Sequence, residues 1–495
     1  MTASYNLSLL GSNYNQGGSG AVARTTASKL QESVSVKDFG AVGDGSTDDT
    51  AALAAFFLAV QGKSGFIPNG VYLTTATLVI NTPNTHIYGD AAPGSGASLA
   101  GSVIKYTGTG TALRLGVNPD VNGTFLADIL LQNLKIEVAT NTNTAIYAWH
   151  LLSSCFRRVN IFGNSGTGRY GLRVRGGVSN TYEQIDIQGF NGAGGVPANY
   201  LQYGMSIELG YLNDPYTATV FRDCYFHYCL YGSIINSGFV DFYHTVIESN
   251  TIGLISNGYA TAGVYNCWFE ANLSLACYFA IGDMISITDS KLDSYAVVAM
   301  ISANSVSSIV FKACRITSSN VSPTLFDGGS LSGSKITVDG CLFSTAYRFG
   351  GVNYGGAPVK LFVDMPRTTY RFVQTAVAAN TSYPAVPTES GIANARFIMP
   401  EAGHILGPRI WYTGTISAGT WQGNPLKNGA NVVSLVLAPQ SSSPVVTNTI
   451  PMLESVVAGD QLSFYIITSI GFAATGGSFV AEVIVQHGND GRILP

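Results

Sequence analysis

Three acidic residues in the middle of the chain, Glu248, Glu270 and Asp293, are separated by 22 and 23 positions. Each directly follows a six-residue pattern whose first, fourth and sixth residues are apolar or small. Two carboxyl groups can hydrolyse a glycosidic bond when one gives a proton to the leaving oxygen and the other is ionised. That chemistry requires a scaffold that brings such widely spaced residues into line.

The six-residue pattern occurs nine times between residues 131 and 343. Successive occurrences start 25, 26, 39, 21, 22, 23, 24 and 27 residues apart, which is the period range of a solenoid whose turns stack on one another. They begin at Leu131, Phe156, Tyr182, Phe221, Phe242, Val264, Ile287, Phe311 and Val338. Each occurrence is therefore predicted to belong to one turn.

The side-chain pattern indicates two short strands joined by a corner. The fourth and sixth positions share parity and point inward, whereas the first position has the opposite parity and must precede the corner. The third position supports the corner, because Asn and Asp tolerate a left-handed backbone. Its polar residues are Asn133, Gln184, Asp223, His244, Asn266 and Asp289. The pattern predicts a parallel β-helix.

The residue after each pattern, the seventh position, points outward. This column reads Glu137, Phe162, Gln188, His227, Glu248, Glu270, Asp293, Thr317 and Ser344. Neighbouring turns lie about 4.8 Å apart, so adjacent acids are expected roughly 5 Å apart and alternate ones about 10 Å apart. Retaining and inverting glycosidases hold their carboxyl groups about 5–5.5 Å and about 6.5–9.5 Å apart, respectively. We predict Glu248, Glu270 and Asp293 as the catalytic set, with roles unassigned.

The outward fifth position adds aromatic and basic side chains beside the acids. An aromatic ring flanked by polar groups suits a sugar subsite. We predict that substrate is bound by Tyr225, His227, His244, Trp268, Lys291 and Arg315. The three acids Glu248, Glu270 and Asp293 also fit a solvated acidic face neutralised by Lys291 and Arg315, or a face within a trimer interface.

A second group of charged residues lies on earlier turns. It comprises Arg157, Arg158, Arg169, Arg173 and Arg175, with Glu183 and Asp186. Arginines can neutralise a uronate while a base removes the α-proton, as a polysaccharide lyase requires. Surface solubility is the simpler interpretation of these arginines.

Composition argues against several classes of partner. Charged residues make up 11% of the chain and the net charge is −4, so no basic field favours nucleic acid or a membrane surface. Residues 1–16 lack a basic start and a long apolar core, and the longest apolar run, residues 51–60, is too short to span a bilayer. We expect no secretory signal, no membrane insertion and no nucleic-acid partner.

Four of the seven cysteines, Cys224, Cys267, Cys314 and Cys341, occupy the fourth position of the pattern. They are expected to stack as small buried residues. No CxxC pair occurs, so disulfides and a metal framework have little support. We predict no metal and no cofactor.

A helix is expected between residue 46 and the first strands. Its apolar residues are Leu53, Phe56, Phe57 and Val60, at helical spacing. Ser46 or Thr47 is expected to cap it, and Asp48 and Asp49 suit the positive end of its dipole. Its apolar face is expected to cover the open end of the solenoid.

Residues 38–53, DFGAVGDGSTDDTAAL, closely resemble the N-terminal signature of the pectate-lyase-like right-handed β-helix superfamily. With residues 27–33, the uneven turns and a β-rich C-terminus, the chain resembles a bacteriophage tailspike. The resemblance implies an all-β fold built on a right-handed parallel β-helix with an N-terminal capping helix. The superfamily includes hydrolases, lyases and non-catalytic binders, so the signature does not identify a reaction. Asp38, Asp44, Asp48 and Asp49 are interpreted as turn and cap residues.

Beyond residue 345 the repeat stops. Short alternating runs separated by turn residues predict a C-terminal β-sandwich. We expect a lead-in or virion-attachment segment at 1–33, the β-helix at 34–350 and the C-terminal domain at 366–495. In tailspikes that this chain resembles, such domains trimerise the chain and some contact sugar. Trp411 and Trp421 are therefore candidate sugar platforms, although core packing is preferred for Trp411.

An insertion at about residues 189–217 interrupts the repeat. It contains Tyr200, Tyr203, Tyr211 and Tyr216. Inserted loops on a repeat scaffold commonly shape the binding face. An extra irregular turn with buried tyrosines is an equally good interpretation.

The resemblance and the acidic column together predict a homotrimeric tailspike, made in the host cytoplasm and located in the phage virion. It is expected to bind and hydrolyse a bacterial surface polysaccharide, capsule or O-antigen, and to contact other phage tail or baseplate proteins. A polysaccharide lyase acting by β-elimination on a uronate polymer is the second hypothesis. A non-catalytic receptor-binding adhesin is the third.

Overall fold

The computed structural model of the chain divides into two compact units, Met1–Ser344 with Phe349–Phe362, and Thr345–Arg348 with Val363–Pro495. The residues that the structure describes are 13–92, 101–116, 124–139, 142–163, 166–189, 201–209, 217–258, 260–294, 299–318, 324–327, 335–343, 347–349, 360–364, 367–375, 382–387, 397–399, 403–413, 415–431, 445–447, 454–457, 459–469, 472–475, 478–487 and 493–494.

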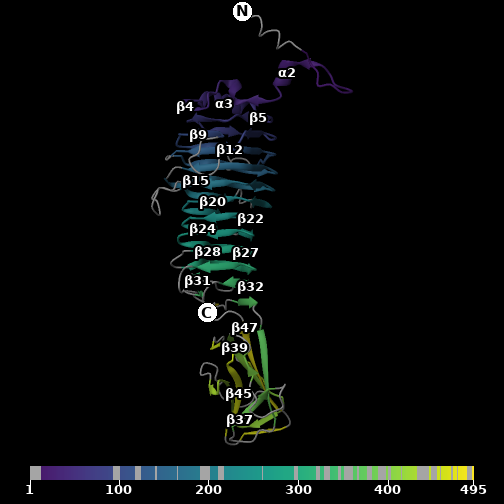
Figure 1. Cartoon of the computed structure of the whole chain (residues 1–495), viewed down its shortest axis with the longest axis vertical. Helices are drawn as coiled ribbons and strands as arrows, with labels where there is room; N and C mark the ends of the chain where they lie inside the picture. Colours follow the sequence, from purple (N-terminus) through teal and green to yellow (C-terminus); the bar gives the residue numbers. More distant parts are fainter. Residues whose placement is uncertain are drawn as a thin grey trace, which may run out of the picture. The chain divides into compact units, whose positions relative to one another are not determined.

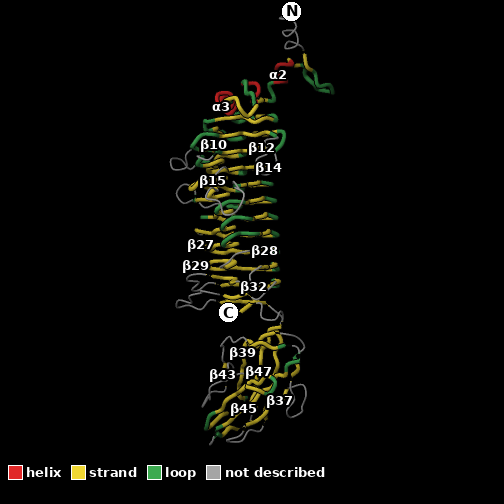
Figure 2. Tube along the Cα trace, turned by 60° about the vertical axis from the view of Figure 1, so that its left-hand side comes forward, coloured by secondary structure: helices red, strands yellow, loops and turns green. Residues whose placement is uncertain are grey.

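The first unit contains a solenoid of parallel strands, and each turn adds one strand to each of three sheets (Figures 1 and 2). The first sheet consists of β3 (Val34–Ser35), β5 (Ser64–Ile67), β8 (His86–Gly89), the first parts of β12 (Leu130–Val138) and β14 (Cys155–Gly163), β16 (Thr181–Glu183), β19 (Thr219–Arg222), β22 (Gly238–Tyr243), β25 (Ala260–Tyr265), the last parts of β27 (Leu275–Thr288) and β29 (Ala299–Lys312), and β32 (Lys335–Asp339).

The second sheet follows the first after a corner in each turn. It consists of β4 (Asp44–Asp48), β6 (Gly70–Thr74), β9 (Ser102–Tyr106), the last parts of β12 and β14, β17 (Asp186–Gln188), β20 (Tyr225–His227), β23 (Val246–Glu248), β26 (Trp268–Glu270), β28 (Lys291–Ser294), β30 (Arg315–Ser318) and β33 (Leu342–Phe343).

The third sheet completes each turn. It consists of β7 (Leu78–Ile80), β10 (Thr111–Leu115), β13 (Thr144–Leu152), β15 (Gly166–Val178), β18 (Leu201–Glu208), β21 (Tyr231–Ile235), β24 (Ile252–Asn257), the first parts of β27 and β29, and β31 (Thr324–Asp327). Strand β11 (Leu126–Ala127) pairs with the end of β13. Other short elements are β1 (Asn13–Tyr14), β2 (Arg24–Thr25), α2 (Thr26–Leu30), β34 (Tyr347–Phe349), β35 (Lys360–Asp364) and β48 (Ile493–Leu494).

The core of the solenoid is built from the inward positions of the repeat. The first-position residue of all nine occurrences is at most 1% exposed. Three of these rings, Tyr182, Phe221 and Phe242, stack on successive turns with centroids 4.6 and 5.3 Å apart. Burial of large apolar side chains is the main stabilising contribution to such a core. The parallel β-solenoid predicted from the repeat is confirmed.

The corner between the first and second sheets requires one residue with a left-handed backbone. All six polar residues at the third position have φ between 49° and 55°. Arg158 and Ala313 occupy the same position and adopt φ of 49° and 51°. Asn and Asp enter this region at lower cost than other non-glycine residues. The turn geometry therefore imposes the conformation, even where Arg or Ala must accept it.

A buried column of asparagines supports the corner between the second and third sheets, and the repeat did not reveal it. Asn250 Oδ1 accepts the backbone N–H of Cys229 at 2.9 Å, and Asn272 Oδ1 accepts that of Asn250 at 3.2 Å. Asn272 Nδ2 donates to the Ile247 carbonyl at 2.9 Å. Because these backbone groups are buried, the amides supply partners that water cannot.

Three of the four fourth-position cysteines pack as the repeat predicts, whereas Cys341 is only half-buried. Cys224, Cys267 and Cys314 are buried, and none of the seven cysteines forms a disulfide. Burial raises the pKa of Cys224 and Cys267 to about 12, which keeps both thiols protonated. These residues therefore serve as small apolar core side chains.

Helix α3 (Thr50–Ala59) lies beside the first turn and buries Leu53, Phe56 and Phe57 (Figure 1). Its N-cap is Asp49, so the prediction that Ser46 or Thr47 caps it is wrong. Both of those residues lie in β4, where the Asp44 carboxylate accepts their backbone N–H groups at 2.9 and 2.7 Å.

The four aspartates of the 38–53 segment all accept backbone N–H groups. Asp38 closes a capping box with Ser35 around the 3₁₀-helix η1 (Val36–Phe39). Asp49 accepts from residues 42 and 43, and Asp48 accepts from residue 50. Their hydrogen bonds place them as turn and cap residues, as interpreted from the sequence.

The second unit is an antiparallel β-structure with strand order β42-β41-β45-β37-β36-β47-β39-β43. In addition, β38 pairs with β45, and β44 pairs with β39. A further antiparallel pair joins β40 and β46. The strands are β36 (Arg367–Thr375), β37 (Ser382–Pro387), β38 (Phe397–Ile398), β39 (Gly403–Tyr412), β40 (Thr415–Ala418), β41 (Trp421–Lys427), β42 (Ala430–Asn431), β43 (Val445–Thr447), β44 (Glu454–Val456), β45 (Gln461–Thr468), β46 (Ala473–Thr475) and β47 (Ser478–His487). The sandwich arrangement of these strands stays a prediction.

Trp421 belongs to the core of this unit. It is 1% exposed and its ring lies 5.0 Å from that of Phe479. A ring enclosed in this way cannot stack on a sugar, so Trp421 as a sugar platform was wrong. The side chain of Trp411 lies outside the described residues.

Replacing Asn272 with Ala should destabilise the solenoid by about 1–3 kcal/mol, because the substitution leaves the buried N–H of Asn250 and the carbonyl of Ile247 without partners. Urea unfolding followed by circular dichroism measures this. The matched control is Asn266→Gly, which removes an exposed amide from a residue whose φ of 51° glycine adopts freely. Equal stability of the two variants would contradict the structural role of the asparagine column.

Candidate active site

The three predicted catalytic acids lie on consecutive strands of the second sheet. In the register of the strands, Glu248 of β23 is opposite Glu270 of β26, which is opposite Asp293 of β28. All three side chains are half-buried and lie on the outer face. Neighbouring parallel strands are about 4.8 Å apart, and like charges in such positions repel each other. The column therefore needs groups that offset this repulsion.

The two outer acids each have a donor, and the middle acid has none among the described residues. The hydroxyl of Tyr225 donates to Glu248 Oε1. Lys291 Nζ lies 3.2 Å from Asp293 Oδ2. Burial and, secondly, the hydrogen bond to Glu248 raise the pKa of Tyr225 well above its usual range, so this phenol keeps its proton and remains a donor. The arrangement distinguishes Glu270 from its neighbours.

Trp268 provides an aromatic surface next to Glu270. It is 38% exposed, and Lys291 Nζ lies 4.3 Å from the centre of its ring. Arg315 is opposite Lys291 on the following strand and is exposed. Indole rings bind cations and sugar rings through their faces. The outer face of β26, β28 and β30 thus combines a ring, two cations and two acids.

The side chain of His227 is 3% exposed, which leaves no surface for a sugar to contact. The prediction that His227 binds substrate directly is therefore wrong. Its Nε2 lies 2.9 Å from Asp186 Oδ1, and its ring stacks on Tyr225 with centroids 3.8 Å apart. The imidazole therefore supports the ring of Tyr225 by stacking face to face against it.

His244 is not part of this arrangement. It lies at the corner before β23, is 59% exposed, and places Nδ1 3.5 Å from Asp223 Oδ1. The two histidines therefore occupy very different environments.

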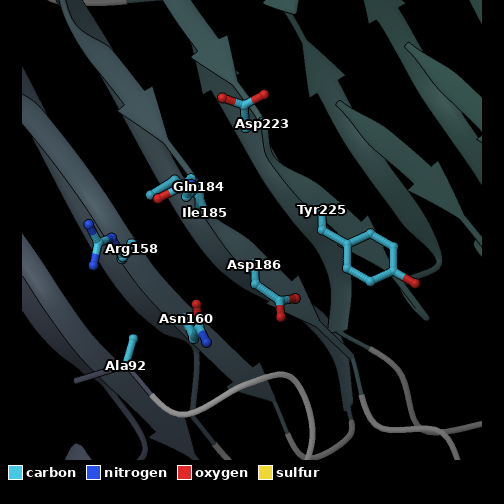
Figure 3. Close-up of a pocket in the computed structure, with 8 residues that line it drawn as sticks. All are labelled: Ala92, Arg158, Asn160, Gln184, Ile185, Asp186, Asp223 and Tyr225. Atoms are coloured by element: carbon cyan, nitrogen blue, oxygen red, sulfur yellow. The ribbon is translucent and has the colours of Figure 1, made fainter. Parts of the chain in front are cut away.

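A surface pocket of about 310 Å³ lies on the same face, beside Tyr225 (Figure 3). Asn160, Asp186 and Tyr225 follow one another in register on β14, β17 and β20. The third-position residues of the same turns form a second row. The lining residues are Ala92, Arg158, Asn160, Gln184, Ile185, Asp186, Asp223 and Tyr225.

Sequence reasoning did not assign this pocket. Its signal was present in the repeat, because Asn160 and Asp186 hold the outward fifth position on the turns before Tyr225. Gln184 and Asp223 were recognised only as corner residues, and Arg158 only as a member of the charged group on earlier turns. A left-handed corner turns their side chains toward the outer surface, where they form one wall of the pocket.

The five arginines do not form one cluster. Arg157 lies at the end of the first sheet, where Nε is 2.8 Å from Glu183 Oε2. Arg158 lines the pocket. Arg173 and its neighbours belong to β15 of the third sheet, and Arg173 makes two hydrogen bonds of 2.8 Å to Glu208. Residues close in sequence are separated here because each turn passes through three sheets.

No group of three or more His, Cys, Asp or Glu side chains within the described ranges is arranged to hold a metal ion. In the same part of the chain, no helix is long and apolar enough to cross a membrane.

A solenoid of three parallel sheets with carboxylates along one outer face belongs to the class of β-helix proteins. Residues 33–255 match the family model described as "Rhamnogalacturonase A/epimerase, pectate lyase-like". The matched residues include the signature at 38–53 on which the resemblance seen in the sequence rests. A search of curated protein sequences found no match.

Solved structures with similar folds include proteins of different kinds. The tailspike protein of Acinetobacter phage vB_ApiP_P1 is 14% identical, with 94% of this chain and 88% of that chain covered and a TM-score of 0.47. The catalytic unit of a GH87 α-1,3-glucanase from Streptomyces thermodiastaticus is 12% identical, with coverages of 70% and 69% and a TM-score of 0.38. PfbA, a surface adhesin of Streptococcus pneumoniae, is 15% identical, with coverages of 65% and 93% and a TM-score of 0.44. None of their activities follows for this chain.

A double-mutant cycle of Asp186→Asn and His227→Gln should give a coupling energy of roughly 0.5–3 kcal/mol, because the two groups are in contact and largely buried. Urea unfolding of the wild type, both single variants and the double variant measures it.

The matched control is the pair Asp223 and His244, which is exposed and whose coupling should be at most about 0.5 kcal/mol. A coupling for Asp186 and His227 no larger than for the control would mean that this contact stabilises the fold no more than an exposed pair does.

Proposed function

We propose that the chain is a tailspike-type depolymerase that hydrolyses a bacterial surface polysaccharide, capsule or O-antigen, and acts as a homotrimer in a phage virion. The observation that carries the proposal is the line of Glu248, Glu270 and Asp293 on consecutive strands, with a different donor beside each outer acid. The pectate-lyase-like match of residues 33–255 supports a polysaccharide as the ligand class.

Glu270 is the proposed proton donor, because it stands between two carboxylates and has no cation or phenol of its own among the described residues. A protonated Glu270 gives its proton to the glycosidic oxygen as the bond to the leaving sugar breaks. The carboxylate of Glu248, beside Tyr225, or of Asp293, beside Lys291, attacks the anomeric carbon. Water then releases the sugar from the carboxylate, with Glu270 taking up a proton.

The spacing of the strands favours retention of configuration. Adjacent members of the column are separated by about one strand spacing, about 4.8 Å, which is close to the separation in retaining glycosidases. Trp268 and the pocket beside Tyr225 would hold sugar units on the two sides of the cleaved bond.

β-Elimination is the second candidate, favoured by the presence of Arg158 and Tyr225 in one pocket. Arg158 would neutralise a uronate and Tyr225 would remove the α-proton. Because burial and Glu248 raise the pKa of Tyr225, the phenolate needed as base is disfavoured at neutral pH. This is why hydrolysis is preferred.

Glu270→Gln should lower the cleavage rate by roughly 10²–10⁴-fold, the usual contribution of a general acid. One of Glu248→Gln and Asp293→Asn should have an effect of similar size. The measurement is product size, new reducing ends and ultraviolet absorbance on a panel of purified capsular and O-chain polysaccharides.

Glu183→Gln is the control, because it removes a carboxylate of a surface ion pair on the first sheet and should leave the rate unchanged. Unchanged cleavage rates in all three acid variants would show that Glu248, Glu270 and Asp293 are not the catalytic residues. Absorbance of unsaturated uronate would establish a lyase, and binding without cleavage of any polymer would establish an adhesin.

A further inference from the structure

A tyrosine directly precedes a glycine in three successive strands of the third sheet. Tyr170 of β15 pairs in register with Tyr203 of β18, which pairs with Tyr231 of β21. The glycines are required, since a Cβ on Gly171 would lie 2.6 Å from the carbonyl oxygen of Gly204. The close approach of the turns thus holds the three tyrosines in one line, here called the tyrosine strip.

The rings of the tyrosine strip stack on one another. The ring centroids of Tyr170 and Tyr203 lie 4.6 Å apart, and those of Tyr203 and Tyr231 lie 5.3 Å apart. Because the ring faces cover each other, the half-buried strip presents ring edges and hydroxyl groups outward. Gln202 Nε2 donates to the hydroxyl oxygen of Tyr203 at 3.1 Å, so the phenolic proton is left to donate. Burial raises the pKa of Tyr170 and Tyr203, which keeps both hydroxyls protonated.

Arg173 extends the strip with further donors. Its guanidinium carbon lies 4.6 and 4.7 Å from the ring centres of Tyr147 and Tyr170. Nε and Nη2 each donate to a carboxylate oxygen of Glu208 at 2.8 Å. A guanidinium has five N–H groups, so donors remain after this ion pair. The neighbourhood is therefore rich in donors and acceptors while its charges are paired.

We propose that the tyrosine strip, with Arg173 and Glu208, is a second carbohydrate-binding surface for an uncharged, polyhydroxylated stretch of polysaccharide. The hydroxyls recur once a turn, about every 4.8 Å along the solenoid axis, which suits a linear polymer with repeated hydroxyl groups. The ligand class rests on the proposed function. The strip belongs to the same three turns as Asn160, Asp186 and Tyr225 of the pocket, but to a different sheet.

The shape and chemistry of the strip favour a sugar polymer over a protein partner. A protein interface is centred on a desolvated apolar core with a polar rim. The strip is one side chain wide and carries hydroxyl, amide, guanidinium and carboxylate groups. A second copy of the chain remains the alternative occupant that the experiment must distinguish.

The test removes the three hydroxyls and keeps the stack, with the triple variant Tyr170→Phe, Tyr203→Phe and Tyr231→Phe in the full chain. Binding to each immobilised polysaccharide of the capsular and O-chain panel is measured, whether or not that polymer is cleaved. We expect binding at least tenfold weaker than wild type, since each lost hydrogen bond weakens binding by roughly two- to tenfold. Thermal unfolding should be unchanged, because the rings still stack.

The matched control is Tyr243→Phe with Tyr265→Phe, a stacked pair with centroids 4.9 Å apart on the first sheet. This double variant should bind as the wild type does. Equal binding by both sets, or no binding of the wild type to any polymer, would overturn the inference. A triple variant that binds normally and changes the sedimentation behaviour instead would also overturn it and assign the strip to contact between copies.

Failure of the proposed function has a separate readout. If no polymer is shortened but one binds, and the triple variant binds it more weakly, the carbohydrate-binding role of the tyrosine strip is supported and the proposed hydrolysis is contradicted. If polymers are shortened and the triple variant binds and cleaves them normally, the proposed hydrolysis is supported and the carbohydrate-binding role of the tyrosine strip is contradicted.

Discussion

The structure depends on one constraint at the corner between the first and second sheets. One residue of each turn must adopt a left-handed backbone there, so that the next strand pairs in parallel register with the turn before it. Arg158 and Ala313 accept a φ that costs such residues energy, which shows how strongly the stacked turns impose it. Once the register is set, residues at equivalent positions form columns one strand spacing apart. The acidic column, the pocket row and the tyrosine strip are all consequences of this register.

The register explains how a line of acids is tolerated. Parallel pairing offers Glu248 and Asp293 diagonal or same-strand partners from the fifth position, Tyr225 and Lys291, which offset part of the repulsion. Glu270 lies between them without such a partner in the described part of the chain. This asymmetry is the feature on which the proposed acid catalysis rests, because such catalysis requires carboxyl groups in two different states.

The columns were predictable because they follow from one local pattern, and the corner residues Asn133 and Asp289 carried the signal for the turn. Diagonal contacts were not predictable. His227 contacts Asp186 one turn earlier, across the 39-residue interval with its insertion. The prediction of one arginine cluster failed for a related reason. Arginines that are close in sequence lie on different sheets of the solenoid. Trp421 gave no periodic signal that distinguishes a core ring from an exposed one.

The glycines that follow the tyrosine strip have a consequence for how such a chain changes over generations. Segments between the sheets vary in length, as the intervals of 21 to 39 residues demonstrate, but Gly171 and its counterparts leave no room for even one methyl group. Insertions are therefore expected in the segments between the sheets, where a longer loop leaves the pairing of the strands unchanged. Ligand preference can drift while the alignment of the columns is inherited intact.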